Sequence, residues 1–219
     1  MAEIFISEEE IGKVSFGQSV YHKSLLDGGV DPFWTCRLPH GPMKMLDRAW
    51  YDLSEGTGKY GKGYLRAEKD VKVDDWYFYS HFLGDPVMPG TIGLDGCYQC
   101  LGLTLLLMGF AGVARALAGT FEYNGQVLTS VKKTTYRMDV KRVFTKPSPL
   151  LIADVDYFKD EDEAPIYKLR DARMGFFRKG ELDRSPSYLP DWNKVKDAAI
   201  RQIEQSRQYY LDRFGKEGM

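Results

Sequence analysis

The sequence predicts an α+β protein in which one long apolar helix is covered by antiparallel strands. Residues 91–110 contain a single charged residue, Asp95, and they follow a turn with two prolines, which is typical of the start of a buried helix. On both sides of this stretch, short runs that favour strands are separated by segments rich in glycine, proline and aspartate. One helix among such strands gives a layered α+β architecture.

The long helix should begin near Gly90. Pro86 and Pro89 exclude helix before about residue 89, and Pro89 suits a first turn because the N–H that it lacks would have no partner there. A short helix should also follow Ser7, since Ser7 and Glu10 have the spacing of a capping box. Strands are predicted at 45–54, 60–71, 113–123, 130–144, 150–159 and 165–178.

The two ends of the chain differ from this body. Residues 17–44 are rich in glycine and proline and are predicted to form an irregular covering segment. Residues 181–192 have the composition of a linker, and residues 193–215 favour a weakly amphipathic helix. That helix could pack on the body or on a partner. We therefore expect one domain over 1–180 and an extension over 181–219.

Composition limits the classes of function. A net charge of −1 and a pI near 6.3 give no electrostatic case for binding nucleic acid. The acidic N-terminus is unlike a signal peptide, and three cysteines without a secretion signal predict reduced thiols in the cytoplasm. The apolar stretch 91–113 contains Asp95, Gln99 and five glycines, so a buried helix is favoured over a membrane span.

Cofactor chemistry finds little support in the sequence. Cys97 and Cys100 have the spacing of a redox pair, but they lie about two turns inside an apolar helix, which favours core packing. No cysteine and histidine cluster has zinc-binding spacing, and no dinucleotide fingerprint occurs. We therefore expect neither a metal nor an organic cofactor.

Three features near the start of the long helix could form an acid–base site. Asp95 is an isolated carboxylate that must be paired, solvated or used, because burying an unpaired charge is costly. His81 precedes it by fourteen residues, and the first helical turn offers free N–H groups. Gln99 lies on the same helical face as Asp95. By itself, a lone histidine such as His81 is more often structural than catalytic, and Gln99 could simply satisfy backbone groups.

Residues 81–90, HFLGDPVMPG, together with GLD at 93–95, closely resemble the central motif of the 3-hydroxyacyl-(acyl-carrier-protein) dehydratases. The branch that they resemble is the 3-hydroxydecanoyl dehydratase/isomerase, and the likeness covers roughly residues 7–178. It includes LPHGPMKMLDR (38–48), GKGYLRAEKDV (61–71), ARALAG (114–119), FEYNGQVL (121–128) and KKTTYRMDVKRV (132–143). The resemblance implies a hotdog fold for residues 1–180, with a long central helix wrapped by a curved antiparallel β-sheet.

The resemblance also implies a reaction, the dehydration of 3-hydroxyacyl thioesters to trans-2-enoyl thioesters in fatty-acid or polyketide biosynthesis. His81 would be the base at C2, Asp95 would protonate the leaving hydroxyl, and the N–H of Gly90 would hold the thioester oxygen. Gln99 would orient the carboxyl group of Asp95. Relatives that only dehydrate commonly carry glutamate at the aspartate position, so Asp95 favours additional trans-2 to cis-3 isomerisation. Ser80 stands where the family has cysteine.

The implied partners are an acyl carrier protein and a second copy of the chain, whose Asp95 would face His81. A basic cluster is the best docking surface for an acidic carrier, although it could also be a solvated strand face. Its members are Lys132, Lys133, Arg137, Lys141 and Arg142. KPSP at 146–149 replaces the paired arginines of the family. Two alternatives to the dehydratase are a hotdog acyl-thioester hydrolase and a non-catalytic acyl-binding subunit. The presence of both His81 and Asp95 in the motif argues against each of them.

Overall fold

The structure is a computed structural model that describes residues 3–15, 36–39, 41–110, 112–178 and the single residues 181, 201 and 208. Its helical elements are α1 (Glu8–Ser15), η2 (Gly41–Met43), η3 (Trp76–Tyr79) and α3 (Gly90–Leu107). Its strands are β1 (Ile4–Ile6), β2 (Arg48–Asp52), β3 (Tyr64–Asp70), β4 (Val113–Tyr123), β5 (Lys133–Phe144), β6 (Leu150–Lys159) and β7 (Tyr167–Phe177).

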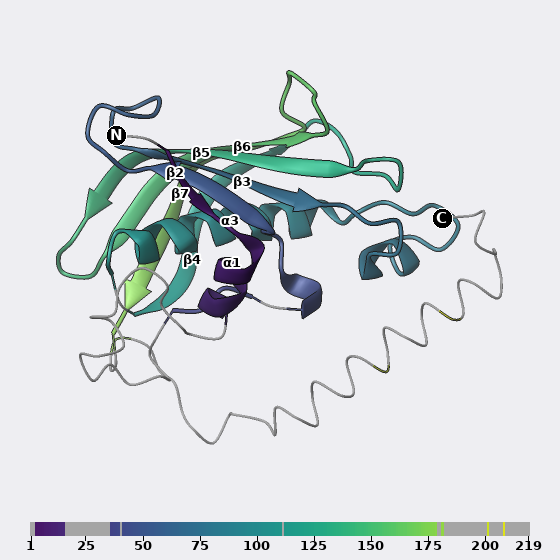
Figure 1. Ribbon diagram of the computed structural model, residues 1–219, viewed down its shortest axis with the longest axis horizontal. Coiled ribbons are helices and arrows are strands. Elements are labelled where there is room, and N and C mark those ends of the chain that lie inside the picture. The colour runs from purple at the N-terminus through teal and green to yellow at the C-terminus, as the bar shows by residue number, and fades with distance from the viewer. Residues whose placement is uncertain are drawn as a thin grey trace.

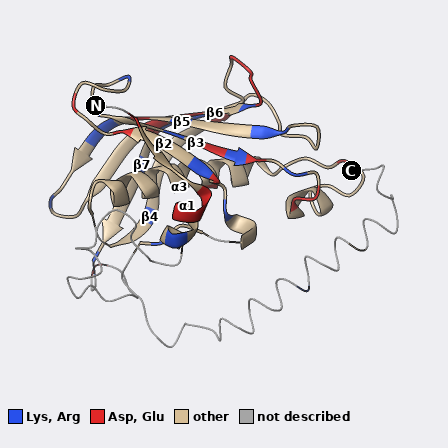
Figure 2. Cartoon of the chain, in the orientation of Figure 1, with Lys and Arg blue, Asp and Glu red and all other residues tan. Residues whose placement is uncertain are grey.

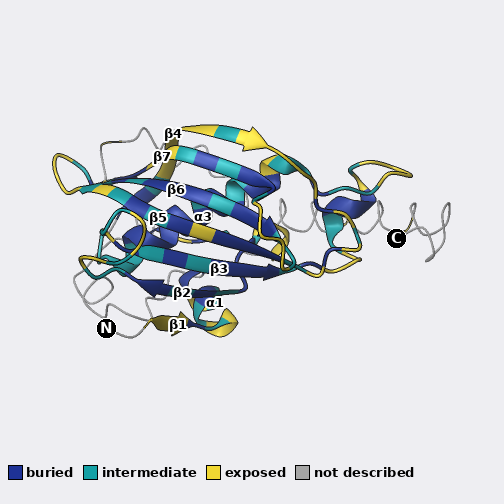
Figure 3. Ribbon diagram, turned by 90° about the horizontal axis from the view of Figure 1, so that it is seen from above, coloured by how far each residue is buried: buried dark blue, intermediate teal, exposed yellow. Residues whose placement is uncertain are grey.

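The strands form one antiparallel sheet in the order β1-β2-β3-β5-β6-β7-β4. The sheet curves over α3, and α1 lies on the same side of the sheet as α3 (Figure 1). This arrangement confirms the α+β prediction and the hotdog fold that the resemblance implied. The edge strands β1 and β4 are the most exposed strands, whereas the central strands are largely buried (Figure 3).

Helix α3 packs closely on the sheet because glycines face it. A Cβ atom on Gly93 would lie 2.7 Å from the ring of Tyr167, and one on Gly96 would lie 2.1 Å from the hydroxyl of Tyr136. Cys97 and Cys100 are fully buried in the same helix, and burial raises the pKa of both thiols. This environment agrees with the prediction that they pack in the core rather than act as a redox pair.

Most predicted elements are present with slightly shorter bounds. The capping box of α1 is formed, since the N–H of Ser7 donates to Glu10 Oε2 at 2.8 Å and the N–H of Glu10 donates to Ser7 Oγ at 3.4 Å. All six predicted strands occur, and β1 is an additional strand that the sequence analysis missed. The predicted helix over 193–215 and the linker before it lie outside the described residues, apart from three single positions.

The outer face of the sheet, turned away from α3, carries paired charges. Basic and acidic residues are interspersed along β2, β3 and β5 (Figure 2). Glu68, for example, is nearly buried and accepts from Arg48 and from Arg66, each at 2.8 Å. Among the described residues, no helix combines the length and the apolar character needed to cross a membrane.

Candidate active site

His81 lies in the turn that joins η3 to α3. Its backbone N–H donates to the carbonyl of Tyr77 at 2.9 Å, and the N–H of Val87 donates back to its own carbonyl at 2.8 Å. The Nδ1 atom of the half-buried ring lies 3.0 Å from the carbonyl oxygen of Val87. Because a carbonyl only accepts, Nδ1 must carry the hydrogen, and in the neutral ring the lone pair is left on Nε2. Nε2 is therefore the atom that could take a proton.

Asp95 lies in the second turn of α3 and is half-buried. Gln99 Nε2 donates a hydrogen bond to Asp95 Oδ2 at 2.6 Å. Burial raises the pKa of the Asp95 carboxyl group, and the hydrogen bond from Gln99 opposes that shift only in part. A carboxyl group with a raised pKa is protonated over a wider pH range, which suits a general acid.

The amide of Gln99 is held in one orientation by the chain before β2. Its Oε1 accepts from the N–H of Met45 at 3.0 Å, and its Nε2 donates to the carbonyl of Met43 at 2.8 Å. The NH₂ group must therefore face Asp95, because the oxygen is already committed to a donor. The sequence analysis placed Gln99 beside Asp95 but missed both of these partners, which lie more than fifty residues earlier in the chain.

Gly90 opens α3 directly after Pro89, which provides no side-chain cap. Among the described residues, the N–H groups of Gly90 and Thr91 donate no hydrogen bond. These donors are at the positive end of the helix dipole, where a developing negative charge is stabilised. The geometry is thus open to the oxygen of a polarised carbonyl group.

Within one chain, the four predicted site residues do not all contact one another. Asp95 and Gln99 are hydrogen-bonded, whereas His81 makes no hydrogen bond, ion pair or ring contact with either of them in the described part of the chain. Asp95 lies on the less buried side of α3, which it shares with Thr91, Leu94 and Tyr98. That side faces away from the glycines that contact the sheet.

The predicted basic cluster is spread along β5 rather than gathered in one patch. Lys133 pairs with Glu68 and Glu161 at 3.5 and 3.3 Å, and Lys141 pairs with Asp154 and Asp171 at 3.0 and 2.7 Å.

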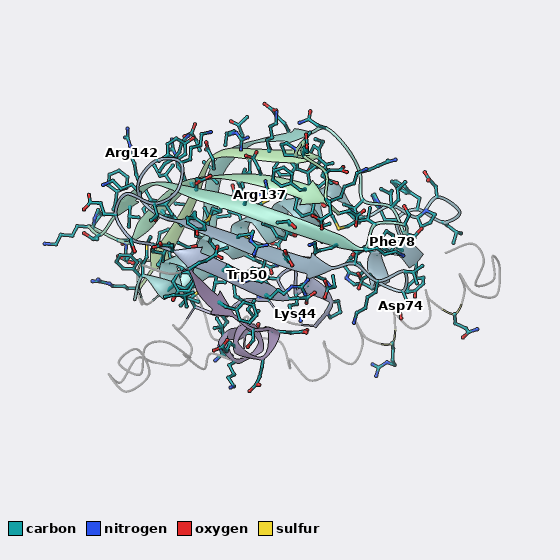
Figure 4. All side chains as sticks on the ribbon, turned by 45° about the horizontal axis from the view of Figure 1, so that its top comes forward. Lys44, Trp50, Asp74, Phe78, Arg137 and Arg142 are labelled. Carbon is teal, nitrogen blue, oxygen red and sulfur yellow. The ribbon has the colours of Figure 1, made fainter. Side chains whose placement is uncertain are left out.

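The remaining members form no ion pair with a carboxylate in the part of the chain that the structure describes. The guanidinium of Arg137 lies 4.4 Å from the ring centroid of Phe158, and neither Lys132 nor Arg142 forms an ion pair within the described chain. Arg137 is near the middle of the outer face, while Arg142 is at one end of the sheet (Figure 4). Within the same described part, no three His, Cys, Asp or Glu side chains gather as metal ligands would.

The curved antiparallel sheet over one long helix is the architecture of a hotdog domain. The model of the FabA-like domain family matches residues 38–168, which is more than half of the chain. The chain therefore belongs to the FabA-like domain family, in agreement with the resemblance of the motif at 81–95.

Several solved structures are similar to this chain at low sequence identity and with TM-scores below 0.5. The dehydratase heterocomplex ApeI:P from Xenorhabdus doucetiae is 12% identical with a TM-score of 0.47, over 66% of this chain and 90% of that chain. A candidate thioesterase from Pseudomonas aeruginosa is 16% identical with a TM-score of 0.41, over 60% and 96%. A MaoC-like dehydratase from Rhodospirillum rubrum is 9% identical with a TM-score of 0.33, over 52% and 91%.

Proposed function

We propose that the protein dehydrates 3-hydroxyacyl thioesters, carried on an acyl carrier protein, to trans-2-enoyl thioesters. The observation that carries this proposal is that the chain has one group able to accept a proton, on His81, and one suited to donate a proton, on Asp95. The hydrogen bond from Nδ1 to Val87 leaves His81 Nε2 able to accept a proton. The raised pKa of Asp95 prepares its carboxyl group to donate one.

The reaction follows from these two roles. His81 Nε2 removes a proton from C2, and the electrons of that C–H bond form the new double bond between C2 and C3. The C3–oxygen bond breaks, and the hydroxyl leaves as water with the proton from Asp95. During this step negative charge develops on the thioester oxygen, which the N–H of Gly90 would stabilise. Exchange with solvent then restores the protonation of both residues.

We propose further that the site is shared between two copies of the chain. His81 and Asp95 do not contact each other within one chain, so a second copy could supply the missing half. Among the described strands, β4 is an edge strand that pairs only with β7, and its Leu117 is 52% exposed; Phe82 beside His81 is 55% exposed. Exposed apolar side chains on a long edge strand favour pairing with another chain. These features support a homodimer.

The finer assignments rest on the family motif. An aspartate at position 95 favours trans-2 to cis-3 isomerisation after dehydration, as in the 3-hydroxydecanoyl branch. The pathway would be fatty-acid or polyketide biosynthesis in the cytoplasm, which suits three cysteines that are all free and buried. Lys132, Arg137 and Arg142 are the cations left to attract an acidic carrier protein.

Incubation with 3-hydroxyacyl thioesters of several chain lengths, loaded on carrier protein and on free pantetheine, tests the proposal. Products are resolved as trans-2-enoyl thioester, cis-3-enoyl thioester and free acid. We expect the trans-2 product with every substrate that turns over, and a faster rate on the carrier protein. Release of free thiol without an enoyl product would instead identify a thioester hydrolase, and no turnover of any substrate would indicate an acyl-binding subunit.

A further inference from the structure

Residue 90 has no room for a side chain. A Cβ atom on Gly90 would lie 2.2 Å from Cε1 and 2.7 Å from Cδ1 of Tyr123, far inside contact distance. Tyr123 is the last residue of β4, so the edge strand ends with its ring against the first residue of α3. The ring therefore occupies the volume that any larger residue at position 90 would need.

The ring of Tyr123 is itself held by aromatic neighbours. Its centroid lies 4.4 Å from that of Phe121 and 5.2 Å from that of Tyr167, both in edge-to-face geometry. Tyr167 is buried and lies under Gly93, one turn further along α3. Two successive glycines of the helix thus rest on two adjacent tyrosines, and this register fixes where the helix begins relative to the sheet.

The contact involves the Cβ position of Gly90 and not its N–H group. A Cα–Cβ bond of a helix stands out from the axis and tilts toward the N-terminus, whereas the free N–H groups of a first turn point along the axis. Tyr123 is 52% exposed, and its hydroxyl has no hydrogen-bond partner among the described residues. The ring, rather than the hydroxyl, carries the contact with Gly90.

We propose that Tyr123 is a positioning residue for the thioester-carbonyl site, and that its ring is the reason why residue 90 is glycine. This inference rests on the proposed function, in which the N–H of Gly90 holds the thioester oxygen. The competing explanation is that glycine admits the substrate to the backbone. The two explanations differ in what happens when the ring is removed, because only the first makes a methyl group at position 90 tolerable.

The test compares full-length wild type with Gly90→Ala, Tyr123→Ala, Tyr123→Phe and the double variant Gly90→Ala/Tyr123→Ala. Displacing a catalytic donor by about 1 Å can cost ~10²-fold in rate, so Gly90→Ala and Tyr123→Ala should each lower kcat by up to about that factor. KM should change little, and Tyr123→Phe should restore kcat because it keeps the ring. The double variant should be as fast as Tyr123→Ala, because without the ring a methyl group at position 90 no longer clashes with the chain. Phe5→Ala, an equally exposed aromatic on the opposite edge strand, serves as the matched control.

Two results would overturn the inference. A double variant slower than Tyr123→Ala would mean that the substrate, not Tyr123, excludes a side chain at position 90. Tyr123→Phe as slow as Tyr123→Ala would assign the effect to the hydroxyl. Thermal unfolding of the same variants separates this inference from the proposed function. If wild type converts no thioester, the proposed function fails, but the contact between Gly90 and Tyr123 can still be tested. That contact is refuted if Gly90→Ala lowers Tm by the same amount with and without the Tyr123 ring.

Discussion

Two poorly exposed carboxylates, one on each side of the sheet, have very different hydrogen-bond donors. Asp154, on the outer face, accepts from the Tyr60 hydroxyl at 2.6 Å, from the N–H of Asp171 at 2.9 Å and from Lys141 at 3.0 Å. Burial by itself would raise the pKa of Asp154, but these donors lower it below the ordinary value. Asp95 has one neutral amide donor, so burial dominates and its pKa is raised.

This difference in hydrogen-bond donors helps to distinguish a carboxylate that stabilises the fold from one that is suited to transfer a proton. Glu68, like Asp154, is surrounded by cations and serves to hold strands together. No cation lies within ion-pair distance of Asp95 in the described part of the chain. The incomplete compensation of a buried charge is a common property of groups that transfer protons.

The largest effect is expected when either of the two proposed proton-transfer residues is replaced. His81→Ala and Asp95→Asn should each lower the dehydration rate by ~10²–10⁴-fold, because each removes a general base or acid. Both variants should still fold, since neither residue lies in an ion-pair network. The rate is measured by the ultraviolet absorbance of the conjugated enoyl thioester, and folding by circular dichroism. Wild-type turnover by either folded variant would remove that residue from the mechanism.

Mixing the same two variants tests whether the site is shared. If they are unfolded and refolded together, about half of the dimers should be mixed, each with one intact site of two, so roughly a quarter of the activity should return. Demonstrably mixed dimers without any recovery would place both residues in a site formed by one chain.

Local signals in the sequence were enough to predict where α3 begins and to single out Asp95 within it. Pro86 and Pro89 fix where α3 can begin, and Asp95 stands out because its neighbours are apolar. These signals depend on residues close together in the chain, as does the capping box of α1. The observed start of α3 at Gly90 agrees with the prediction.

Long-range pairings could not be predicted in the same way. Met43 and Met45 hold Gln99 through backbone atoms, which carry no signature of residue type. Lys133 and Lys141 formed part of a basic run in the sequence, yet carboxylates from other strands neutralise them. Only the register of the sheet brings those partners together, so a charge count along one strand overstates its positive potential.

A moderate effect is expected on the outer face. Asp154→Asn should lower the free energy of unfolding by about 1–3 kcal/mol near pH 7, because Lys141 would lose a charged partner in a poorly exposed place. Since folding lowers the pKa of Asp154, its stabilising effect is present above the unfolded pKa and is lost as the pH falls through the folded pKa. The difference from wild type, measured by urea unfolding, should therefore shrink in acid. Dehydration should be unaffected, and a loss of activity in folded Asp154→Asn would undermine the separation of the two sides.

The smallest effect is expected when Gln99 is replaced, because this shifts the pKa of Asp95 but keeps its carboxyl group. The hydrogen bond from Gln99 lowers the pKa of Asp95, so Gln99→Leu should raise that pKa further. Gln99→Glu keeps the length of the side chain and its acceptor for the N–H of Met45, but it places a second carboxyl group beside Asp95 and should raise the pKa more. Because the acid must be protonated to act, the alkaline limb of kcat/KM against pH should move to higher pH in the order wild type, Gln99→Leu, Gln99→Glu. A limb that stays fixed in both variants would mean that a group other than Asp95 sets it. A shift to lower pH would contradict the view that Gln99 stabilises the carboxylate, since removing such a donor can only favour the protonated form.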